Sequence, residues 1–170
     1  MMDKPDIERA RLHSLPHYRQ PTPAQSVRRH LVVIQSAGVC PAFVGELDQP
    51  QLLNAENADF SSRLDSSLAA CSVGTRLYLV GDEAFIWRIH ALARSAGLQD
   101  DEIDMTLSVS GLRTVYCVHC GLKQPGTQQD SLQCSGCKVL LEIREHFSRR
   151  LGAYLGVCGN PDQPYAGFRP

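Results

Sequence analysis

The sequence lacks a long hydrophobic run. No stretch approaches the roughly 20 consecutive apolar residues that a membrane-spanning helix requires. It also lacks the apolar N-terminal segment of a secretory leader, because charged side chains crowd its first ten residues: Lys4, Asp6, Glu8 and Arg9. We therefore expect a cytoplasmic protein.

A disulfide framework is the second missing feature. The chain has 7 cysteines, an odd number that no set of internal disulfides can use completely. Disulfides are also rare in the reducing cytoplasm. The thiols are therefore expected to serve in packing, redox chemistry or metal binding.

A strong net charge is missing as well, since the formal value is −1. The charges are unevenly distributed, with six Lys/Arg against three Asp/Glu in residues 1–30, four against eleven in 31–110, and seven against four in 111–170. This distribution favours distinct segments, and the acidic middle is a poor surface for nucleic acid, although ordinary solvated faces would give the same pattern.

No catalytic constellation can be recognised: there is no Ser/His/Asp arrangement, phosphate cradle or paired carboxylate site with a base. Asp100, Asp101 and Glu102 are adjacent, and we interpret them as a solvated loop.

Two Cys-x-x-Cys pairs are the strongest motif present: Cys117 with Cys120, and Cys134 with Cys137. This spacing is typical of structural zinc ribbons, in which each pair forms a tight knuckle whose N–H groups point at the sulfurs. Gly121 follows the first knuckle, where a positive φ is often needed. The motif predicts a structural zinc site. A rubredoxin-like iron is the alternative, whereas a thioredoxin-like redox pair would occur singly at a helix start.

The remaining candidate ligands are interpreted as structural. His119 lies between two ligand cysteines and is expected on the surface, and His146 is expected to be partly exposed, although it could meet a partner. Three cysteines without metal spacing are predicted to be buried apolar thiols: Cys40, Cys71 and Cys158. The ribbon is expected to have strands at 112–116 and 139–144, joined by a turn-rich loop built on Pro125-Gly126.

The middle of the chain predicts a small parallel α/β unit. Apolar runs at 30–35, 77–80 and 103–109 indicate strands, and 61–70 indicates a helix. A second helix follows Gly81, with Asp82 and Glu83 in its first turn. Its predicted apolar stripe consists of Phe85, Ile86, Ile89, Leu92 and Ala93. Trp87 lies outside this stripe. It is expected either at the edge of the core or on a docking surface.

The stretch "LYLVGDEAFIWRIHALARSAGLQDDEI" resembles the last strand, helix and strand of ferredoxin-reductase-type nicotinamide domains. Gly38 and Pro41 correspond to the later residues of the family's phosphate loop. Its early glycines are replaced by Gln35, Ser36 and Ala37, although a backbone that approaches a pyrophosphate needs glycine there. We infer a truncated, degenerate and non-binding remnant that is kept for assembly.

The stretch "YCVHCG…CSGCKVLLEIREHFSRRLGAYLGVCGNPDQP" resembles the small zinc-ribbon subunits of bacterial dimethylamine monooxygenases, most strongly from Thr114 to about Pro164. The resemblance implies that partner subunits carry the chemistry. One holds haem, and the other is a reductase with flavin, an iron-sulfur cluster and NADPH. The complex converts dimethylamine to methylamine and formaldehyde. Only the four knuckle cysteines carry over to this chain, as metal ligands.

The sequence thus predicts an α/β protein with an extended N-terminal arm (1–29), a degenerate nucleotide-binding-like domain (30–110) and a zinc ribbon with a C-terminal tail (111–170). The arm is proline-containing and is expected to order against a partner. The predicted function is a non-catalytic accessory subunit that aligns haem and reductase subunits.

Two alternatives remain at this point. One is a rubredoxin-like electron-transfer subunit, with iron at the four thiolates. The other is a nucleic-acid-binding zinc ribbon that uses basic and aromatic residues: Arg144, Phe147, Arg149, Arg150 and Tyr154.

Overall fold

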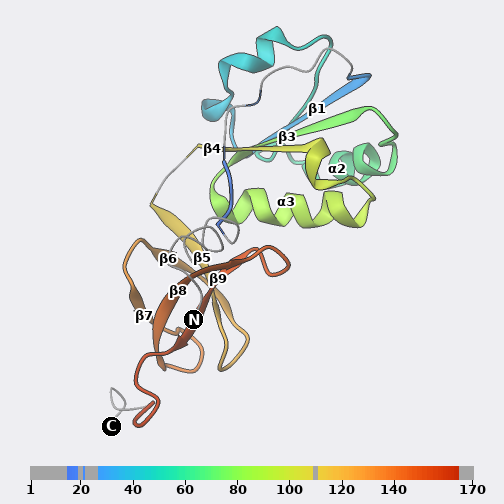
Figure 1. Ribbon diagram of the computed structural model, residues 1–170. Helices are drawn as coiled ribbons and strands as arrows, with labels where there is room; N and C mark the ends of the chain where they lie inside the picture. Colours follow the sequence, from blue (N-terminus) through green and yellow to red (C-terminus); the bar gives the residue numbers. More distant parts are fainter. Residues whose placement is uncertain (1–14, 19–20, 22–26, 109–110, 165–170) are drawn as a thin grey trace, which may run out of the picture. The chain divides into compact units, whose positions relative to one another are not determined.

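The computed structural model describes residues 15–18, 21, 27–108 and 111–164, and most of the predicted N-terminal arm lies outside these ranges. The chain divides into two compact units, one within His17–Ser110 and the other containing the chain from Gly111 onward. Element labels are those of Figure 1. Each unit has its own sheet and its own core, so each is described by itself.

The first unit is built on a parallel sheet of four strands (Figure 1). Its order is β2-β1-β3-β4, with bounds Gln51–Asn54, Arg29–Ile34, Thr75–Gly81 and Ile103–Leu107. The two central strands, β1 and β3, are near-continuous apolar runs, as expected of strands that are covered on both faces. The predicted Rossmann-like parallel unit is confirmed. Strand β2 was not predicted, because Gln51–Asn54 is short and has no clear alternation.

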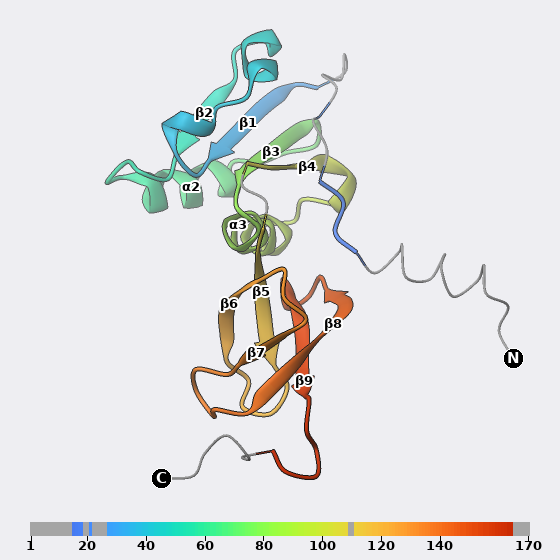
Figure 2. The same cartoon turned by 90° about the vertical axis from the view of Figure 1, so that its left-hand side faces the viewer.

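The two faces of this sheet are covered differently. Helices α2 (Phe60–Ala69) and α3 (Glu83–Ser95) lie on one face, over the larger core cluster (Figures 1 and 2). The other face is covered by two 3₁₀ turns, Ala37–Val39 and Ala42–Glu46, in place of a helix. Phe43 packs there against Val32 and Tyr78. A complete doubly wound domain has helices on both faces, so this unit is a reduced version of that architecture.

Helix α3 differs from its predicted apolar stripe at two positions. Leu92 is 42% exposed, whereas Trp87 is only 4% exposed. The Trp87 Nε1–H donates to the Tyr18 hydroxyl at 2.8 Å. Tyr18 in turn donates to the buried Glu83 carboxylate at 3.0 Å. Helical periodicity could not reveal a contact between residues so distant in the sequence, and Trp87 does not form an open docking surface within this unit.

The second unit is a mixed sheet of five strands in the order β6-β5-β9-β8-β7 (Figure 2). The bounds in that order are Lys123–Thr127, Leu112–Cys117, Ala153–Cys158, Leu140–Ser148 and Ser131–Gln133. Strands β5 and β9 are parallel, and the other neighbours are antiparallel. The hydrophobic core of this sheet includes Val115, Val139 and Leu141. The predicted β-type zinc ribbon is confirmed as a fold class.

The segment predicted as a turn-rich loop contains strand β6, so that prediction is wrong. Pro125 and Gly126 lie within the strand, where Pro125 is opposite Thr114 of β5. Proline cannot donate a ladder hydrogen bond, and it is tolerated here because β6 is at the edge of the sheet. A Pro-Gly pair is typical of turns, so the sequence alone favours a turn here. The edge position of β6 in the sheet makes the pair compatible with a strand.

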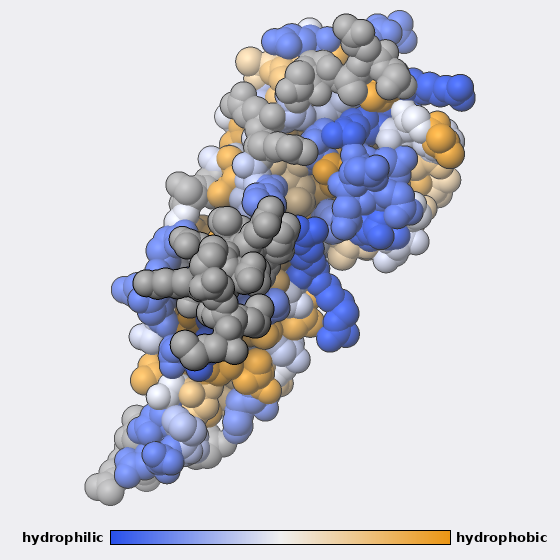
Figure 3. Space-filling view, viewed as in Figure 1, coloured by the Kyte–Doolittle hydropathy of each residue, from blue (hydrophilic) through white to orange (hydrophobic). Residues whose placement is uncertain are grey.

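Large apolar side chains are exposed on the second unit. Hydrophobic patches interrupt the hydrophilic surface over its strands in the view of Figure 3. The exposed large hydrophobic residues of this unit are Leu112, Val118, Leu122 and Leu140. In the part of the chain that the structure describes, no helix has the length and apolar character needed to cross a membrane.

Candidate metal centre

The two Cys-x-x-Cys pairs form two turns with the same backbone hydrogen bonds. Gly121 N–H donates to the Cys117 carbonyl at 2.8 Å, and Lys138 N–H donates to the Cys134 carbonyl at 2.9 Å. Gly121 and Lys138 both have positive φ, 78° and 64°. Glycine takes this conformation freely, whereas for lysine it costs about 1–2 kcal/mol. The predicted need for a left-handed residue after the first knuckle therefore applies to the second knuckle too.

In each knuckle, two backbone N–H groups point at the first of its two sulfurs. The N–H groups of His119 and Cys120 donate to Cys117 Sγ. The N–H groups of Gly136 and Cys137 donate to Cys134 Sγ. These two sulfurs belong to the fully buried cysteines, whereas Cys120 is exposed and Cys137 is half-buried. Such donors stabilise a thiolate, which is the form that binds metals.

The four sulfurs have the spacing of a tetrathiolate metal site. Cys117 Sγ lies 3.7 Å from Cys137 Sγ, and Cys120 Sγ lies 3.6 Å from Cys134 Sγ. All four lie within 4.8 Å of one another. Zinc–sulfur bonds of about 2.3 Å in a tetrahedron separate the sulfurs by about 3.8 Å. The cluster can therefore accept a tetrahedral ion with little rearrangement.

The electrostatics of the thiols are uneven. Burial raises the pKa of Cys117 to about 12, against the effect of its N–H donors. Burial also opposes ionisation of Cys134, but its N–H donors and the neighbouring thiols outweigh it and lower the pKa of Cys134 to about 7. The Val139 N–H favours the thiolate of Cys137, yet burial and the thiols of Cys134 and Cys120 raise the pKa of Cys137. The surroundings thus favour the thiolate of Cys134 and the protonated forms of Cys117 and Cys137.

Gly136 provides space beside the sulfurs. A Cβ at this position would lie 3.5 Å from Cys120 Sγ and 3.8 Å from Cys134 Sγ. It would also lie 3.1 Å from the Leu122 side chain, which would have to move. A side chain on Gly136 would therefore contact one sulfur of each knuckle and crowd Leu122.

The other candidate ligands lie outside the cluster. His119 and His146 are exposed, in agreement with their interpretation as surface residues. The prediction of a buried thiol is wrong for Cys40, which is exposed next to the 3₁₀ turns that replace a helix. Cys71 and Cys158 are half-buried and pack against the cores of their units.

The position that binds nucleotides in doubly wound folds carries a pair of hydrogen-bonded side chains in this protein. It lies where the chain leaves the carboxyl ends of β1 and β3 in opposite directions. Gln35 Nε2 donates to Asp82 Oδ2 at 2.8 Å, and Asp82 N–H donates to Gln35 Oε1 at 2.7 Å. A Cβ on Gly81, the residue before Asp82, would lie 2.9 Å from Gln35 Oε1. The Gln35 side chain therefore packs closely against the backbone at Gly81.

Carboxylates of the chain itself occupy the N–H groups that a phosphate would use. Asp82 Oδ1 accepts from Phe85 N–H at the start of α3, at 2.8 Å. Glu56 Oε2 accepts from Ala37 N–H in the loop after β1, at 2.9 Å. This bond lowers the pKa of Glu56, which favours its charged form. An incoming phosphate would meet negative charge at both positions.

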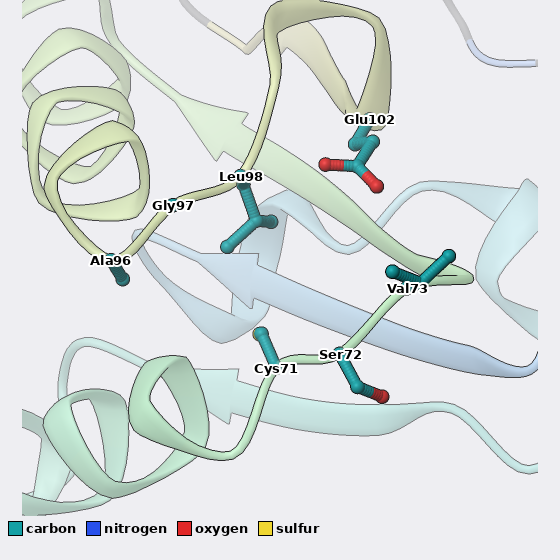
Figure 4. A pocket seen from close by; sticks show the side chains of 7 residues that line it. All are labelled: Cys71, Ser72, Val73, Ala96, Gly97, Leu98 and Glu102. Carbon is teal, nitrogen blue, oxygen red and sulfur yellow. The ribbon is translucent and has the colours of Figure 1, made fainter.

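A cavity of about 260 Å³ lies at the opposite end of the strands of the same sheet (Figure 4). Residues Cys71–Val73 precede β3 and Ala96–Leu98 precede β4, so the cavity is at the amino ends of the strands. Ligands of open α/β sheets bind outside the carboxyl ends. The cavity therefore does not correspond to the lost nucleotide site.

The aromatic residues of the nucleic-acid alternative pack within the sheet. Phe147 is 2% exposed, and its ring meets that of Tyr154 edge-on with centroids 5.0 Å apart. Arg113 lies over the Tyr154 ring at 5.4 Å, and Arg144 is paired with Glu142 at 2.9 Å. Single-stranded nucleic acid binds by stacking on accessible aromatic faces, which Phe147 does not offer.

Comparison with known proteins gives matches in both units. Residues 114–157 match the C-terminal domain of the family described as dimethylamine monooxygenase subunit DmmA-like, and residues 44–103 match its N-terminal domain. The chain is similar to the heme-dependent oxidative N-demethylase delta subunit of Ectopseudomonas mendocina (strain ymp). The two are 46% identical over 165 residues, covering 92% of this chain and 94% of that protein. No solved structure matches.

Proposed function

We propose that this chain is an accessory subunit of a haem-dependent oxidative N-demethylase complex, because it belongs to the family of DmmA-like subunits of dimethylamine monooxygenase. In this proposal the chain is not catalytic. It aligns a haem-binding subunit with a reductase subunit that holds flavin and an iron-sulfur cluster, so that electrons cross a short gap. The complex removes a methyl group from dimethylamine, giving methylamine and formaldehyde.

The observation that carries the proposal is the similarity along nearly the whole chain to a protein named as a delta subunit, a name that implies other subunits. The hydrogen-bonded pair of Gln35 and Asp82 supports the non-catalytic role, because these side chains lie where doubly wound folds bind the phosphates of a nicotinamide cofactor. The exposed leucines of the second unit support protein contacts, since exposed apolar patches commonly mark interfaces.

The metal centre is proposed to hold structural zinc through Cys117, Cys120, Cys134 and Cys137. A four-thiolate zinc ion supplies folding energy and no reaction of its own. The geometry also suits a single iron, and the exposed Cys120 would give such an iron contact with solvent or a partner. Metal analysis of the purified chain distinguishes the two ions. A colourless protein with one zinc is expected, whereas a red protein that dithionite bleaches would establish iron and an electron-transfer role.

The accessory role is tested by producing the chain together with the haem and reductase subunits of its own organism. We expect the chain to co-elute with them in size-exclusion chromatography, and its omission to lower formaldehyde release from dimethylamine. A complex that never contains the chain, and whose N-demethylation is unchanged without it, would show that the proposal is wrong.

The surface involved is tested by Leu140→Glu, because Leu140 is 50% exposed in β8. Val73→Glu is a matched control in the first unit, where Val73 is 89% exposed. We expect Leu140→Glu to weaken co-elution while the metal content stays normal, and Val73→Glu to leave both unchanged. Equal co-elution of the two variants would exclude Leu140 from the interface.

A further inference from the structure

The buried side chain of Gln124 joins the edge strand β6 to the second knuckle. It is 8% exposed, and its Oε1 accepts two hydrogen bonds from Ser135, from the backbone N–H at 2.8 Å and from the hydroxyl at 2.9 Å. Its Nε2 donates to the carbonyl of Gln133 at 3.2 Å. Gln124 therefore binds the backbone on both sides of Cys134.

Neighbouring side chains complete this arrangement. Lys138 Nζ donates to the Ser135 carbonyl at 2.8 Å, and Gln133 Nε2 donates to the Lys138 carbonyl at 3.2 Å. The polar backbone groups around the second knuckle are thus bound by side chains. Of the three side chains involved, Gln124 is the buried one and the one that comes from the other hairpin.

Strand β6 pairs with β5, which ends at Cys117 in the first knuckle. A side chain from β6 that fixes Ser135 therefore connects the hairpin carrying Cys117 and Cys120 to the turn carrying Cys134 and Cys137. The relative position of the two knuckles decides whether four sulfurs can surround one ion. Hydrogen bonds that hold it before the metal arrives reduce the ordering cost of binding.

We propose that Gln124 is a positioning residue of the metal centre, which sets metal affinity without being a ligand. This inference rests on the proposed metal site. Groups that orient ligands typically change metal affinity about 10–100-fold when they are removed. Gln124→Leu leaves the shape similar and removes all three hydrogen bonds. Gln124→Glu keeps an acceptor for Ser135 but loses the donor to the Gln133 carbonyl.

The experiment compares the full-length wild type with Gln124→Leu, Gln124→Glu and the matched control Gln128→Leu, since Gln128 is exposed just after β6. Zinc affinity is measured by competition with a chromophoric chelator, and site geometry by the visible absorption of the cobalt-loaded protein. We expect Gln124→Leu to weaken zinc binding about 10–100-fold and to shift the cobalt bands. Gln124→Glu should fall between Gln124→Leu and the wild type, and Gln128→Leu should equal the wild type.

A double-mutant cycle with Ser135→Ala measures the share of the effect that passes through the Ser135 hydroxyl, because this variant keeps the backbone N–H donor to Gln124. Non-additive effects of Gln124→Leu and Ser135→Ala on zinc affinity would support the hydroxyl contact. Equal zinc affinity in Gln124→Leu and Gln128→Leu would overturn the inference while leaving the metal site in place. A wild type that binds no stoichiometric metal would overturn the site itself and this inference with it.

Discussion

At the scale of single residues, the two knuckles are equivalent in backbone but not in sequence. Gly121 and Lys138 occupy corresponding left-handed positions, with φ of 78° and 64°. We expect Gly121→Ala to destabilise the metal-loaded ribbon by about 1–2 kcal/mol, because alanine strains this conformation. Lys138→Gly relieves backbone strain but loses one exposed hydrogen bond. We therefore expect this variant to be neutral or stabilising. Chelator-induced zinc release measures both, and faster release from Lys138→Gly than from Gly121→Ala would contradict this account.

Metal binding should also displace protons. The pKa values of Cys117 and Cys137 are raised above the usual range of a thiol, so both carry protons at neutral pH. Ligand sulfurs must be deprotonated, so binding should release at least about two protons per zinc, and affinity should fall as the pH is lowered. Calorimetry in buffers of different ionisation enthalpy counts the released protons. Binding without proton release would show that these two sulfurs are not ligands.

The residues of the metal cluster could be predicted because their signal is local. A Cys-x-x-Cys turn brings two sulfurs together within a few residues, so the spacing alone identifies Cys117, Cys120, Cys134 and Cys137 as a candidate set. Gln124 could not be found in this way. It lies 11 residues from Ser135, and a glutamine in the middle of a polar stretch carries no recognisable pattern.

At the scale of elements, the N-terminal segment and α3 are joined through Tyr18. Tyr18→Phe removes both the donor to Glu83 and the acceptor of Trp87 Nε1–H. We expect a loss of about 1–3 kcal/mol in the free energy of unfolding of the first unit, because buried polar groups lose a partner. Trp87 is the one tryptophan of the chain, so its fluorescence during urea unfolding reports this unit alone. Tyr116→Phe, in the other unit, should leave that transition unchanged, and an unchanged midpoint in Tyr18→Phe would exclude the contact.

Elements with a strong internal pattern were predictable, whereas those defined by distant partners were not. β1, β3, α2 and α3 follow from apolar runs and helical periodicity. β6 was not predicted because it contains Pro125-Gly126, a pair typical of turns. This pair is compatible with a strand only at the edge of a sheet. β9 was not predicted, because its place in the sheet depends on parallel pairing with β5 across a long stretch of chain.

At the scale of the whole molecule, the two units should respond differently to loss of the metal. Cys134→Ser removes one proposed ligand from a unit of short strands with a small core, and in such units a structural zinc ion is worth on the order of 10 kcal/mol. We expect this variant to lose its metal, the order of residues 111–158 and its association with partner subunits. The first unit, with its own sheet and helices, should remain folded.

Limited proteolysis and Trp87 fluorescence test this expectation, with Cys158→Ser as the control. Cys158 is half-buried beside the same core but lies outside the sulfur cluster, so its replacement should leave the metal content unchanged. Retained metal in Cys134→Ser, or metal loss in Cys158→Ser, would show that the four-cysteine assignment is wrong. Unfolding of the first unit in Cys134→Ser would show that the units are not independent.

The central position of β9 has a consequence for synthesis. Among the described residues, the pairs β5–β6 and β7–β8 share no ladder with each other except through β9, which is the last of these strands to be synthesised. The four cysteines of the cluster precede it in the chain. If the proposed ion binds these sulfurs during synthesis, it would hold the two hairpins together before β9 inserts between β5 and β8.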